Sequence, residues 1–368
     1  MSILGALPAH GFSPYLAAPS HVLEEMTCEL DAVGVHGLPI EAAGMLDLSE
    51  ALRVRAMLMR ERIDIVHSHM FVASMFISPI ARWARVPTVV ETFHLREVWR
   101  EHKFLKSSFW MDRQIARMVD QYIAVSRAAA SHLIKRKRIA RDKIRVVYNG
   151  RDLSRFRPPT EQERIQARAA LQIGDAQMAL VLGRLEPQKG HTYMLQALEM
   201  LATEWPRLIT LFAGTGQLEA DLMYMRDRAG LGDRVRFLGM VRDPMPLLAA
   251  ADVVVLPSLY EGLPLVAIEA LACAIAMVAT SVEGTPEIIL NNETGVLVPP
   301  ADPSALATAI AKILGNPDWA AKLGRQGRTL VERRFDLRTQ ISETIELYRE
   351  LIERKRVVDE HTTADYGE

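Results

Sequence analysis

The sequence predicts an α/β protein of two domains, each built on a parallel β-sheet flanked by helices. Its 368 residues suit two domains better than one. Short apolar runs alternate with helical patterns along both halves of the chain, as in repeated strand–helix units. Most of these runs are apolar at successive positions, which is typical of parallel strands that are buried on both faces.

The expected strands are spread over both halves of the chain. In the first half they are Tyr15–Ala18, Ile63–His67, Thr88–Thr92, Tyr122–Val125 and Ile144–Tyr148. In the second half they are Ala179–Leu182, Ile209–Ala213, Val235–Leu238, Val253–Leu256 and Met277–Ala279. Helical segments separate most of them, so each half is expected to form one parallel sheet.

A proline-containing connector between the two halves sets the expected domain boundary. We expect a first domain over residues 1–152 and a second over residues 153–335. In residues 336–368, apolar positions repeat at near-helical spacing over about Leu337–Arg356, which predicts a helix that packs back toward the first domain. The polar tail after this helix is expected to be frayed.

The composition is that of an ordinary globular protein, with 49% hydrophobic and 24% charged residues. The net charge of -1 argues against a nucleic-acid binder, which usually carries a basic excess. Residues 1–18 lack the basic start of a secretory signal, and acidic residues interrupt the apolar stretch 244–280, so neither a signal nor a membrane span is expected. We therefore expect a cytoplasmic protein in which Cys28 and Cys273 are buried, reduced thiols.

The most specific motif follows the expected strand Val253–Leu256. It reads Ser-Leu-Tyr-Glu-Gly-Leu-Pro-Leu-Val-Ala-Ile-Glu-Ala over residues 258–270. Gly262 allows a tight turn, and Pro264 suits the first position of a helix that starts near Leu265. The free N–H groups of such a helix form an anion site at the carboxyl end of a parallel strand, where open α/β sheets bind ligands.

Two carboxylates lie in this motif at different distances from the helix start. Glu261 lies in the loop before the helix, and Glu269 lies about one turn inside it. An ionised carboxylate only accepts hydrogen bonds, so both residues suit ribose or sugar hydroxyls. Strand–Gly–Pro–helix turns occur in many α/β proteins, but the complete string is more specific than its parts.

A second motif, Leu-Gly-Arg-Leu-Glu-Pro-Gln-Lys-Gly over residues 182–190, follows the expected strand Ala179–Leu182. Gly183 permits close approach of backbone or ligand, Arg184 offers a planar fork and Lys189 a point charge. Two cations beside a helix N-terminus match a diphosphate. The alternative is a pair of solvated surface cations, and the presence of both motifs in one half favours a shared site.

These two strings resemble the donor-site signatures of glycosyltransferase family 4. Further resemblance to this family lies at residues 120–126, 147–152, 214–216, 235–239, 283–287 and 292–298. The resemblance implies the GT-B fold, with two Rossmann-like domains facing a cleft. It also implies a retaining glycosyltransferase that moves a sugar from a nucleoside-diphosphate sugar to a glycan or lipid-linked acceptor, in cell-envelope or exported polysaccharide synthesis.

The resemblance implies roles for single residues as well. The donor diphosphate would be held by Gly183, Arg184, Lys189, Leu265 and Val266. The transferred sugar would be held by Glu261, Gly262, Leu263 and Pro264, the ribose by Glu269, and the base by Met240 and Val241. The residues implied in catalysis are Glu261 and His94, with His94 facing the donor sugar.

No metal and no cofactor are expected. Arg184, Lys189 and helix N–H groups can stabilise the charge of a departing nucleoside diphosphate as fixed donors. His67 and His69 lie on one strand end, but a metal needs more ligands, so they suit a structural or acceptor-side role. The sequence leaves open whether Glu261 acts as a nucleophile, and the resemblance favours a front-face mechanism in which the leaving phosphate helps to deprotonate the acceptor.

Two segments of the first half are rich in cations. Residues 96–117 combine cations with aromatic residues, and residues 135–138 form a basic run. Such a surface suits peripheral contact with the inner face of a membrane and would serve a lipid-linked acceptor. An ordinary loop and helix on the first domain is the alternative.

The chain departs from the family pattern in two places. The strand, loop and helix that open the family have no counterpart before Tyr15, about 30 residues in all, and their loss would leave unpaired edges in the first sheet. Ala274 and Ala276 stand where the family usually has Gly and Pro, which affects packing more than chemistry.

Two other functions fit less well: a GT-B sugar-nucleotide epimerase, which the Glu-x7-Glu element disfavours, and a non-catalytic donor-binding or scaffold protein.

Overall fold

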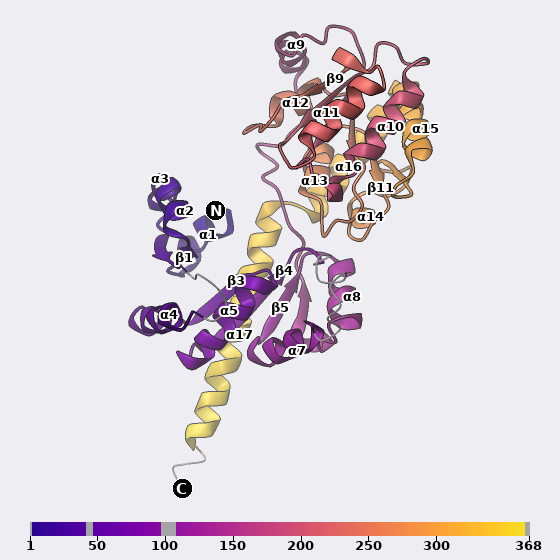
Figure 1. The fold of residues 1–368 in the computed structure, drawn as a ribbon. Helices are drawn as coiled ribbons and strands as arrows, with labels where there is room; N and C mark the ends of the chain where they lie inside the picture. The colour runs from indigo at the N-terminus through magenta and orange to yellow at the C-terminus, as the bar shows by residue number, and fades with distance from the viewer. Residues whose placement is uncertain (1, 42–46, 97–107, 365–368) are drawn as a thin grey trace. The chain divides into compact units, whose positions relative to one another are not determined.

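The computed structural model describes residues 2–41, 47–96 and 108–364, and the chain divides into two compact units (Figure 1). Unit 1 comprises Met1–Val147 and Leu337–Glu368, and unit 2 comprises Tyr148–Asp336. The division lies five residues before the expected boundary at 152/153 (152 − 147). The C-terminal helix belongs to the first unit.

Unit 2 is a six-stranded parallel sheet in the order β12-β11-β10-β7-β8-β9. Its strands are β7 (Met178–Leu182), β8 (Ile209–Ala213), β9 (Val235–Phe237), β10 (Val253–Leu256), β11 (Met277–Thr280) and β12 (Val296–Val298). Its α-helices are α9 (Glu161–Ala170), α10 (His191–Leu201), α11 (Glu219–Arg228), α12 (Met245–Ala250), α13 (Leu265–Ala272), α14 (Thr285–Ile288), α15 (Pro303–Leu314) and α16 (Pro317–Arg334). Two 3-10 turns are η3 (Pro187–Lys189) and η4 (Gly232–Arg234).

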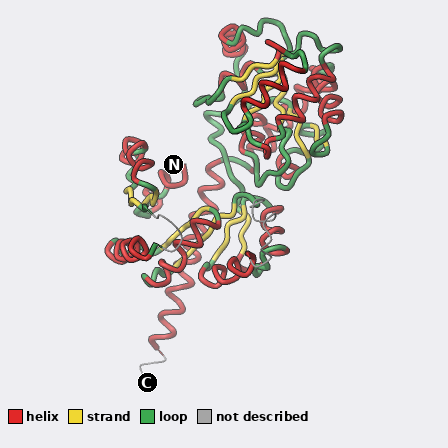
Figure 2. The backbone as a smooth tube through the Cα atoms, viewed as in Figure 1, coloured by secondary structure: helices red, strands yellow, loops and turns green. Residues whose placement is uncertain are grey.

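The core of unit 2 explains why its strands were recognisable from the sequence. Every residue of β7, β10 and β11 is buried, because helices cover the sheet (Figure 2). Alternate strand residues such as Val181 and Val255 share one core with α10 and α15. Burial of both strand faces produces the continuous apolar runs that predicted these strands.

Unit 1 contains two separate parallel sheets, so the expectation of a single sheet in the first half is wrong. Its strands are β1 (Tyr15–Ala18), β2 (His36–Pro39), β3 (Ile65–His69), β4 (Thr88–Phe93), β5 (Gln121–Ala124) and β6 (Ile144–Val146). Within the described ranges, β1 pairs only with β2, whereas β3 to β6 form a sheet in chain order. Strand β2 was not predicted because its sequence, His-Gly-Leu-Pro, has little strand propensity, and its pairing with β1 decides its conformation.

The helices of unit 1 flank these sheets. They are α1 (Ser2–Ala6), α2 (Ser20–Glu25), α3 (Thr27–Ala32), α4 (Leu48–Arg60), α5 (Phe71–Trp83), α7 (Ser108–Met118), α8 (Arg127–Lys135) and α17 (Leu337–Ala364), with 3-10 turns η1 (Pro8–His10) and η2 (Arg141–Lys143). Cys28 on α3 is exposed, which corrects the expectation that both cysteines are buried; Cys273 is buried. The short helix α3 buries only Leu30, so a cysteine two residues earlier faces solvent. None of the helices in the described ranges is both long and apolar enough to cross a membrane.

Helix α17 completes the core of the four-stranded sheet. Its buried residues, among them Ile345 and Leu347, pack with Val90 of β4 and Ile123 of β5. The helix continues to Ala364 instead of fraying after Val358, and residues 357–364 contain no glycine or proline that would end it.

The basic run 135–138 is only partly at the surface. Lys137 is 2% exposed, and its Nζ lies 2.8 Å from Asp112 Oδ1. The same ammonium lies over the rings of Phe71 and Phe93, 5.0 and 4.7 Å from their centroids. The expectation that the whole run faces a membrane is therefore wrong for Lys137, because a buried cation needs an internal counter-charge. Of the segment 96–117, residues 97–107 lie outside the described residues.

Ala274, which stands where the family usually has glycine, is expected to lower the stability of the protein. It has a φ of 57°, a left-handed conformation that disfavours residues with a Cβ. We expect Ala274→Gly to raise the free energy of unfolding by about 0.5–1 kcal/mol. Ala276→Gly is the matched control: Ala276 is buried and has no positive φ, so this change should lower stability by about 1 kcal/mol. Thermal unfolding of the intact chain measures both, and equal shifts would contradict the assignment of strain to Ala274.

Candidate functional site

The first part of the site is the loop that leaves β7. Gly183 follows the strand directly, and its amide donates to the carbonyl of Ala213 at 3.0 Å. The loop then makes the single turn η3, which ends at Lys189. Gly190, with a φ of 65°, is the N-cap of α10. The left-handed glycine thus turns the chain from η3 into the helix.

The second part is the loop between β10 and α13. The helix begins at Leu265 as predicted, and Pro264 is its N-cap residue, one position earlier than expected. Leu265 and Val266 form the first turn, whose N–H groups have no acceptor within the helix. Because β10 and β7 are neighbours in a parallel sheet, the two loops leave the same edge.

Backbone contacts hold these two loops together. The amide of Leu259 donates to the carbonyl of Gln188 at 2.7 Å, and Gln188 Nε2 donates to the carbonyl of Tyr260 at 3.0 Å. A Cβ at Gly190 would lie 2.0 Å from the carbonyl oxygen of Pro257. Position 190 therefore needs glycine for its conformation and for the approach of the second loop.

The close approach of the loops places a cation on a buried carboxylate. Lys189 Nζ lies 2.6 Å from Glu261 Oε1, and Ser258 Oγ donates to the same oxygen at 2.7 Å. The backbone amide of Glu261 donates to Glu283 Oε2 at 2.8 Å. Glu261 is only 5% exposed, so these contacts fix its position and compensate its charge.

Glu269 has a different cation. Its Oε1 lies 2.6 Å from Nε of Arg151, a residue near the start of unit 2. Burial raises the pKa of Glu269, and the charge of Arg151 opposes that shift. The two carboxylates predicted to bind sugar and ribose therefore both lie at this edge of unit 2, each beside its own cation.

The remaining predicted donor-site residues are exposed to different degrees. Arg184 is paired with Glu186, at 2.6 Å, and its side chain is 65% exposed. Met240 and Val241 follow β9, with Met240 78% exposed. The amide of Gly214 donates to the carbonyl of Gly239 at 2.8 Å and so holds the start of this loop beside the end of β8. Of the predicted phosphate, sugar and ribose residues, Lys189 and Glu261 are in direct contact, whereas Arg184 and Glu269 have other partners. The predicted base-contact loop follows another strand of the same sheet.

Sequence reasoning missed three contributors to this arrangement. They are Arg151, Gln188 and Glu283, which contact Glu269, Tyr260 and Glu261, respectively. All three lie within strings that resemble the family, but no local pattern indicates which partner a side chain meets across the sheet edge.

His94 belongs to unit 1, directly after β4. Its Nε2 lies 2.9 Å from Nδ1 of His69, and burial together with His69 lowers its pKa to about 4. His67 bonds to the hydroxyls of Tyr348 and Thr92 at 2.5 and 2.6 Å, and burial lowers its pKa well below the usual value. A structural role is thus evident for His67, and within the described ranges no group of three or more ligands could hold a metal ion.

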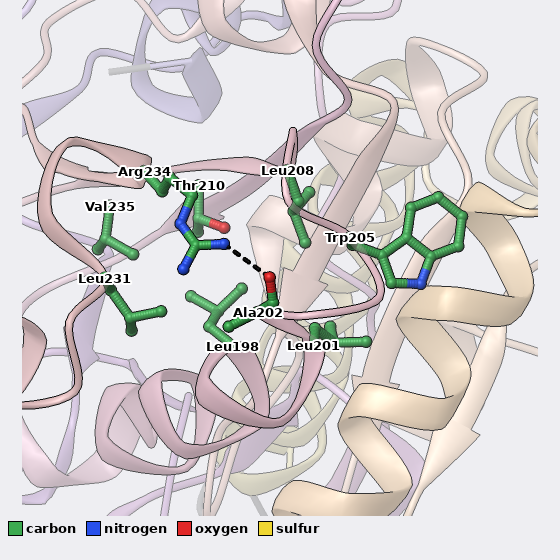
Figure 3. Close-up of a pocket in the computed structure, with 9 residues that line it drawn as sticks. All are labelled: Leu198, Leu201, Ala202, Trp205, Leu208, Thr210, Leu231, Arg234 and Val235. Carbon is green, nitrogen blue, oxygen red and sulfur yellow. Dashed lines mark hydrogen bonds between the residues drawn. The ribbon is translucent and has the colours of Figure 1, made fainter.

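A small cavity in unit 2 lies apart from these residues (Figure 3). It is lined by Leu198, Leu201, Ala202, Trp205, Leu208, Thr210, Leu231, Arg234 and Val235. Its volume is about 10 Å³, and Arg234 donates to the carbonyl of Ala202 at 3.0 Å at its edge. A space of this size holds one water molecule at most, so it is a packing void beside α10 and not a ligand site.

Comparison with known proteins places the chain in a family. The pattern of "Glycosyltransferase Family 4" matches residues 1–155, and that of "Glycosyl transferases group 1" matches residues 163–330. A D-inositol 3-phosphate glycosyltransferase of Thermobispora bispora is 31% identical over 332 residues, which cover 83% of this chain and 75% of that protein. The chain belongs to the family 4 glycosyltransferases.

Other family members extend this comparison. A D-inositol 3-phosphate glycosyltransferase of Streptomyces scabiei is 33% identical over 248 residues, covering 64% of this chain and 55% of that relative's length. The Escherichia coli UDP-Gal:alpha-D-GlcNAc-diphosphoundecaprenol alpha-1,3-galactosyltransferase is 25% identical over 314 residues, covering 84% and 81%. The structure of Anabaena HepE in complex with UDP and glucose matches with a TM-score of 0.83 at 20% identity, covering 95% of this chain and 94% of that chain. The predicted GT-B fold is thereby confirmed.

Gly190 offers a direct test of how the loop after β7 and the loop after β10 are joined. Gly190→Ala would add a methyl group 2.0 Å from the Pro257 carbonyl oxygen in a left-handed conformation, so we expect a loss of stability of about 3 kcal/mol or more. Gly174→Ala is the matched control, because Gly174 has a similar φ of 57° but no heavy atom within 4 Å of the added Cβ. That variant should lose only about 1 kcal/mol. Thermal unfolding compares the two, and equal losses would show that contact with Pro257 is unimportant.

Proposed function

We propose that this chain is a retaining glycosyltransferase that moves a sugar from a nucleoside-diphosphate sugar to a glycan or lipid-linked acceptor. The observation that carries the proposal is the contact of the partly exposed Lys189 with the buried Glu261, at the edge where α13 begins and where Arg184 is exposed. Support also comes from the E. coli relative, which is named for a UDP-sugar donor and a diphosphoundecaprenol-linked acceptor. The solved HepE complex contains UDP and glucose.

The diphosphate would bind to donors that are already in place. Lys189 has three N–H donors, of which Glu261 uses one. Arg184 and the amides of Leu265 and Val266 supply further donors at the positive end of the α13 dipole. Negative charge grows on the diphosphate as the glycosidic bond breaks, and donors held in a fixed arrangement stabilise that charge without reorganisation. This donor set lets the reaction proceed without a metal ion.

Each of the other predicted residues has a role in the same proposal. Glu261, with the loop residues up to Pro264, would hold the transferred sugar, and Glu269 would accept from the ribose hydroxyls. Met240 would lie against the base. His94 is the predicted catalytic residue of unit 1. In the front-face mechanism the leaving phosphate takes the acceptor's proton while Glu261 stabilises the sugar, so the anomeric configuration is retained.

The acceptor proposal includes contact of unit 1 with an anionic membrane surface on the cytoplasmic side, in polysaccharide synthesis. Lys135 and Arg136 are exposed at the end of α8, and Trp110 on α7 is 58% exposed. The buried Lys137–Asp112 pair joins the chain after α8 to α7, the two segments that carry these exposed side chains. Exposed cations and aromatic side chains on one unit suit an anionic lipid interface.

Arg184 tests the diphosphate assignment. Arg184→Ala should weaken binding of UDP or GDP about tenfold or more, because a charge-assisted contact is lost. Its side chain is exposed and its partner among the described residues is Glu186, so stability should be unchanged. Arg207→Ala is the control. Arg207 is exposed just before the amino end of β8, whereas the candidate site lies at the carboxyl ends of the strands. Calorimetric titration measures the affinities, and an unaltered affinity in Arg184→Ala would overturn the assignment.

Glu261 tests the sugar assignment. Glu261→Gln removes the charge that neutralises Lys189, so UDP affinity should stay within about threefold or increase. The turnover number for UDP release from UDP-glucose with sugar acceptors should fall, because an interaction with the reacting sugar is lost. A loss of UDP binding with normal turnover would reverse the assignment. UDP binding by the wild type without any transfer would favour a scaffold, and donor conversion without acceptor would favour an epimerase.

A further inference from the structure

Glu269 is held by a cation from outside the donor loops. Arg151 lies near the start of unit 2, and its Nε approaches Glu269 Oε1 to 2.6 Å. Glu269 is 7% exposed on the second turn of α13, whereas the Arg151 side chain is 34% exposed. Within the described part of the chain, Glu269 Oε2 makes no hydrogen bond.

The backbone of Arg151 is fixed independently of the donor loops. Its amide donates to the carbonyl of Phe335 at 2.9 Å, and Arg151 forms a parallel bridge with Asp336. The guanidinium therefore reaches Glu269 from a position set by the segment that follows α16. The contact is a single close ion pair between Nε and Oε1, and the anchored backbone of Arg151 limits the directions from which its guanidinium can meet the carboxylate.

The surroundings of Glu269 explain why it needs this partner. Burial raises the pKa of Glu269, and Arg151 and Arg155 are the cations that oppose the shift. Cys273 lies one turn further along α13, and burial raises its pKa to about 12, so the thiol is neutral. Arg328 of α16 faces Cys273 and donates to the carbonyl of Ala272 at 2.7 Å. Without Arg151, the carboxyl group would take up a proton at a higher pH.

We propose that Arg151 is a positioning residue of the donor site, which holds Glu269 as an oriented carboxylate and leaves Oε2 to accept from ribose hydroxyls. This inference rests on the proposed donor-binding function. Arg151 itself need not touch the ligand. Its effect on binding should therefore run entirely through the ionisation and orientation of Glu269.

The test is calorimetric binding of UDP and of GDP to Arg151→Gln and wild type between about pH 5.5 and about pH 8.5. The ratio of variant to wild-type affinity cancels the titration of the nucleotide itself. A carboxyl group whose pKa is raised is protonated as the pH falls through that pKa, and it then loses its charge-assisted hydrogen bonds. We expect the variant to bind about tenfold more weakly than wild type at the low end, and to recover to within about threefold at the high end.

Three further variants separate this role from a structural one. Arg151→Lys keeps a positive charge near Glu269 and should show little pH dependence relative to wild type. Arg157→Ala removes a cation from the same connector, where Arg157 pairs with Glu163 and not with Glu269, and should leave the affinity ratio near one. In a Glu269→Gln background, Arg151→Gln should cause no further loss of affinity, because the residue through which it acts no longer titrates.

Two results would contradict the role of Arg151 and leave the proposed donor site intact. One is a loss of affinity in Arg151→Gln that is the same at both ends of the pH range. The other is an equal loss whether residue 269 is Glu or Gln. If wild type binds neither UDP nor GDP at any pH, the donor site itself is refuted and the role of Arg151 falls with it.

Discussion

The contact of Gly190 with the carbonyl of Pro257 is the constraint on which the donor edge of unit 2 depends. It lets the loop after β7 lie directly on the loop after β10, and it brings Lys189 to Glu261. Without that approach, both charges would be buried apart, at a cost of several kcal/mol. Because glycine has no side chain at position 190, the two loops can approach closely enough for the charged side chains of the site to meet.

The two buried carboxylates are neutralised in different ways, and the difference affects what each can do. Glu261 is fixed by Lys189 and Ser258, both within the motif loops, so its surroundings arise from the two strings that resemble the family. Glu269 takes its cation, Arg151, from the segment at the start of unit 2. Arg184 remains the most accessible cation of the predicted diphosphate set. In the proposed function, a diphosphate would meet charges that are already oriented, which is the condition for electrostatic stabilisation of a leaving group.

Unit 1 is organised by buried polar pairs as well as by its apolar core. Tyr348 of α17 bonds to His67 of β3, Glu350 of α17 lies 2.7 Å from Arg145 of β6, and Lys355 lies 2.9 Å from Asp120, the residue before β5. Polar contacts therefore join the C-terminal helix to the sheet at several points. Lys137, expected at the surface, instead joins α7 to the chain after α8 through Asp112. A basic run in a sequence can thus contain a structural cation, because each side chain faces a direction set by the backbone.

Most of the strands and both motif loops could be predicted from local sequence patterns, whereas strand β2 could not. Continuous apolar runs predicted strands such as β7 and β10, because burial of both faces removes the polar positions, and the Gly–Pro turn predicted the start of α13 at Leu265. Only the tertiary structure decided the ion pairs, the division of the first-half strands into two sheets, and the burial of Lys137. These features join residues far apart in the chain: 72 positions separate Lys189 from Glu261. Local patterns report the conformation and burial of each segment, whereas the partner of a side chain depends on which segments the fold brings together.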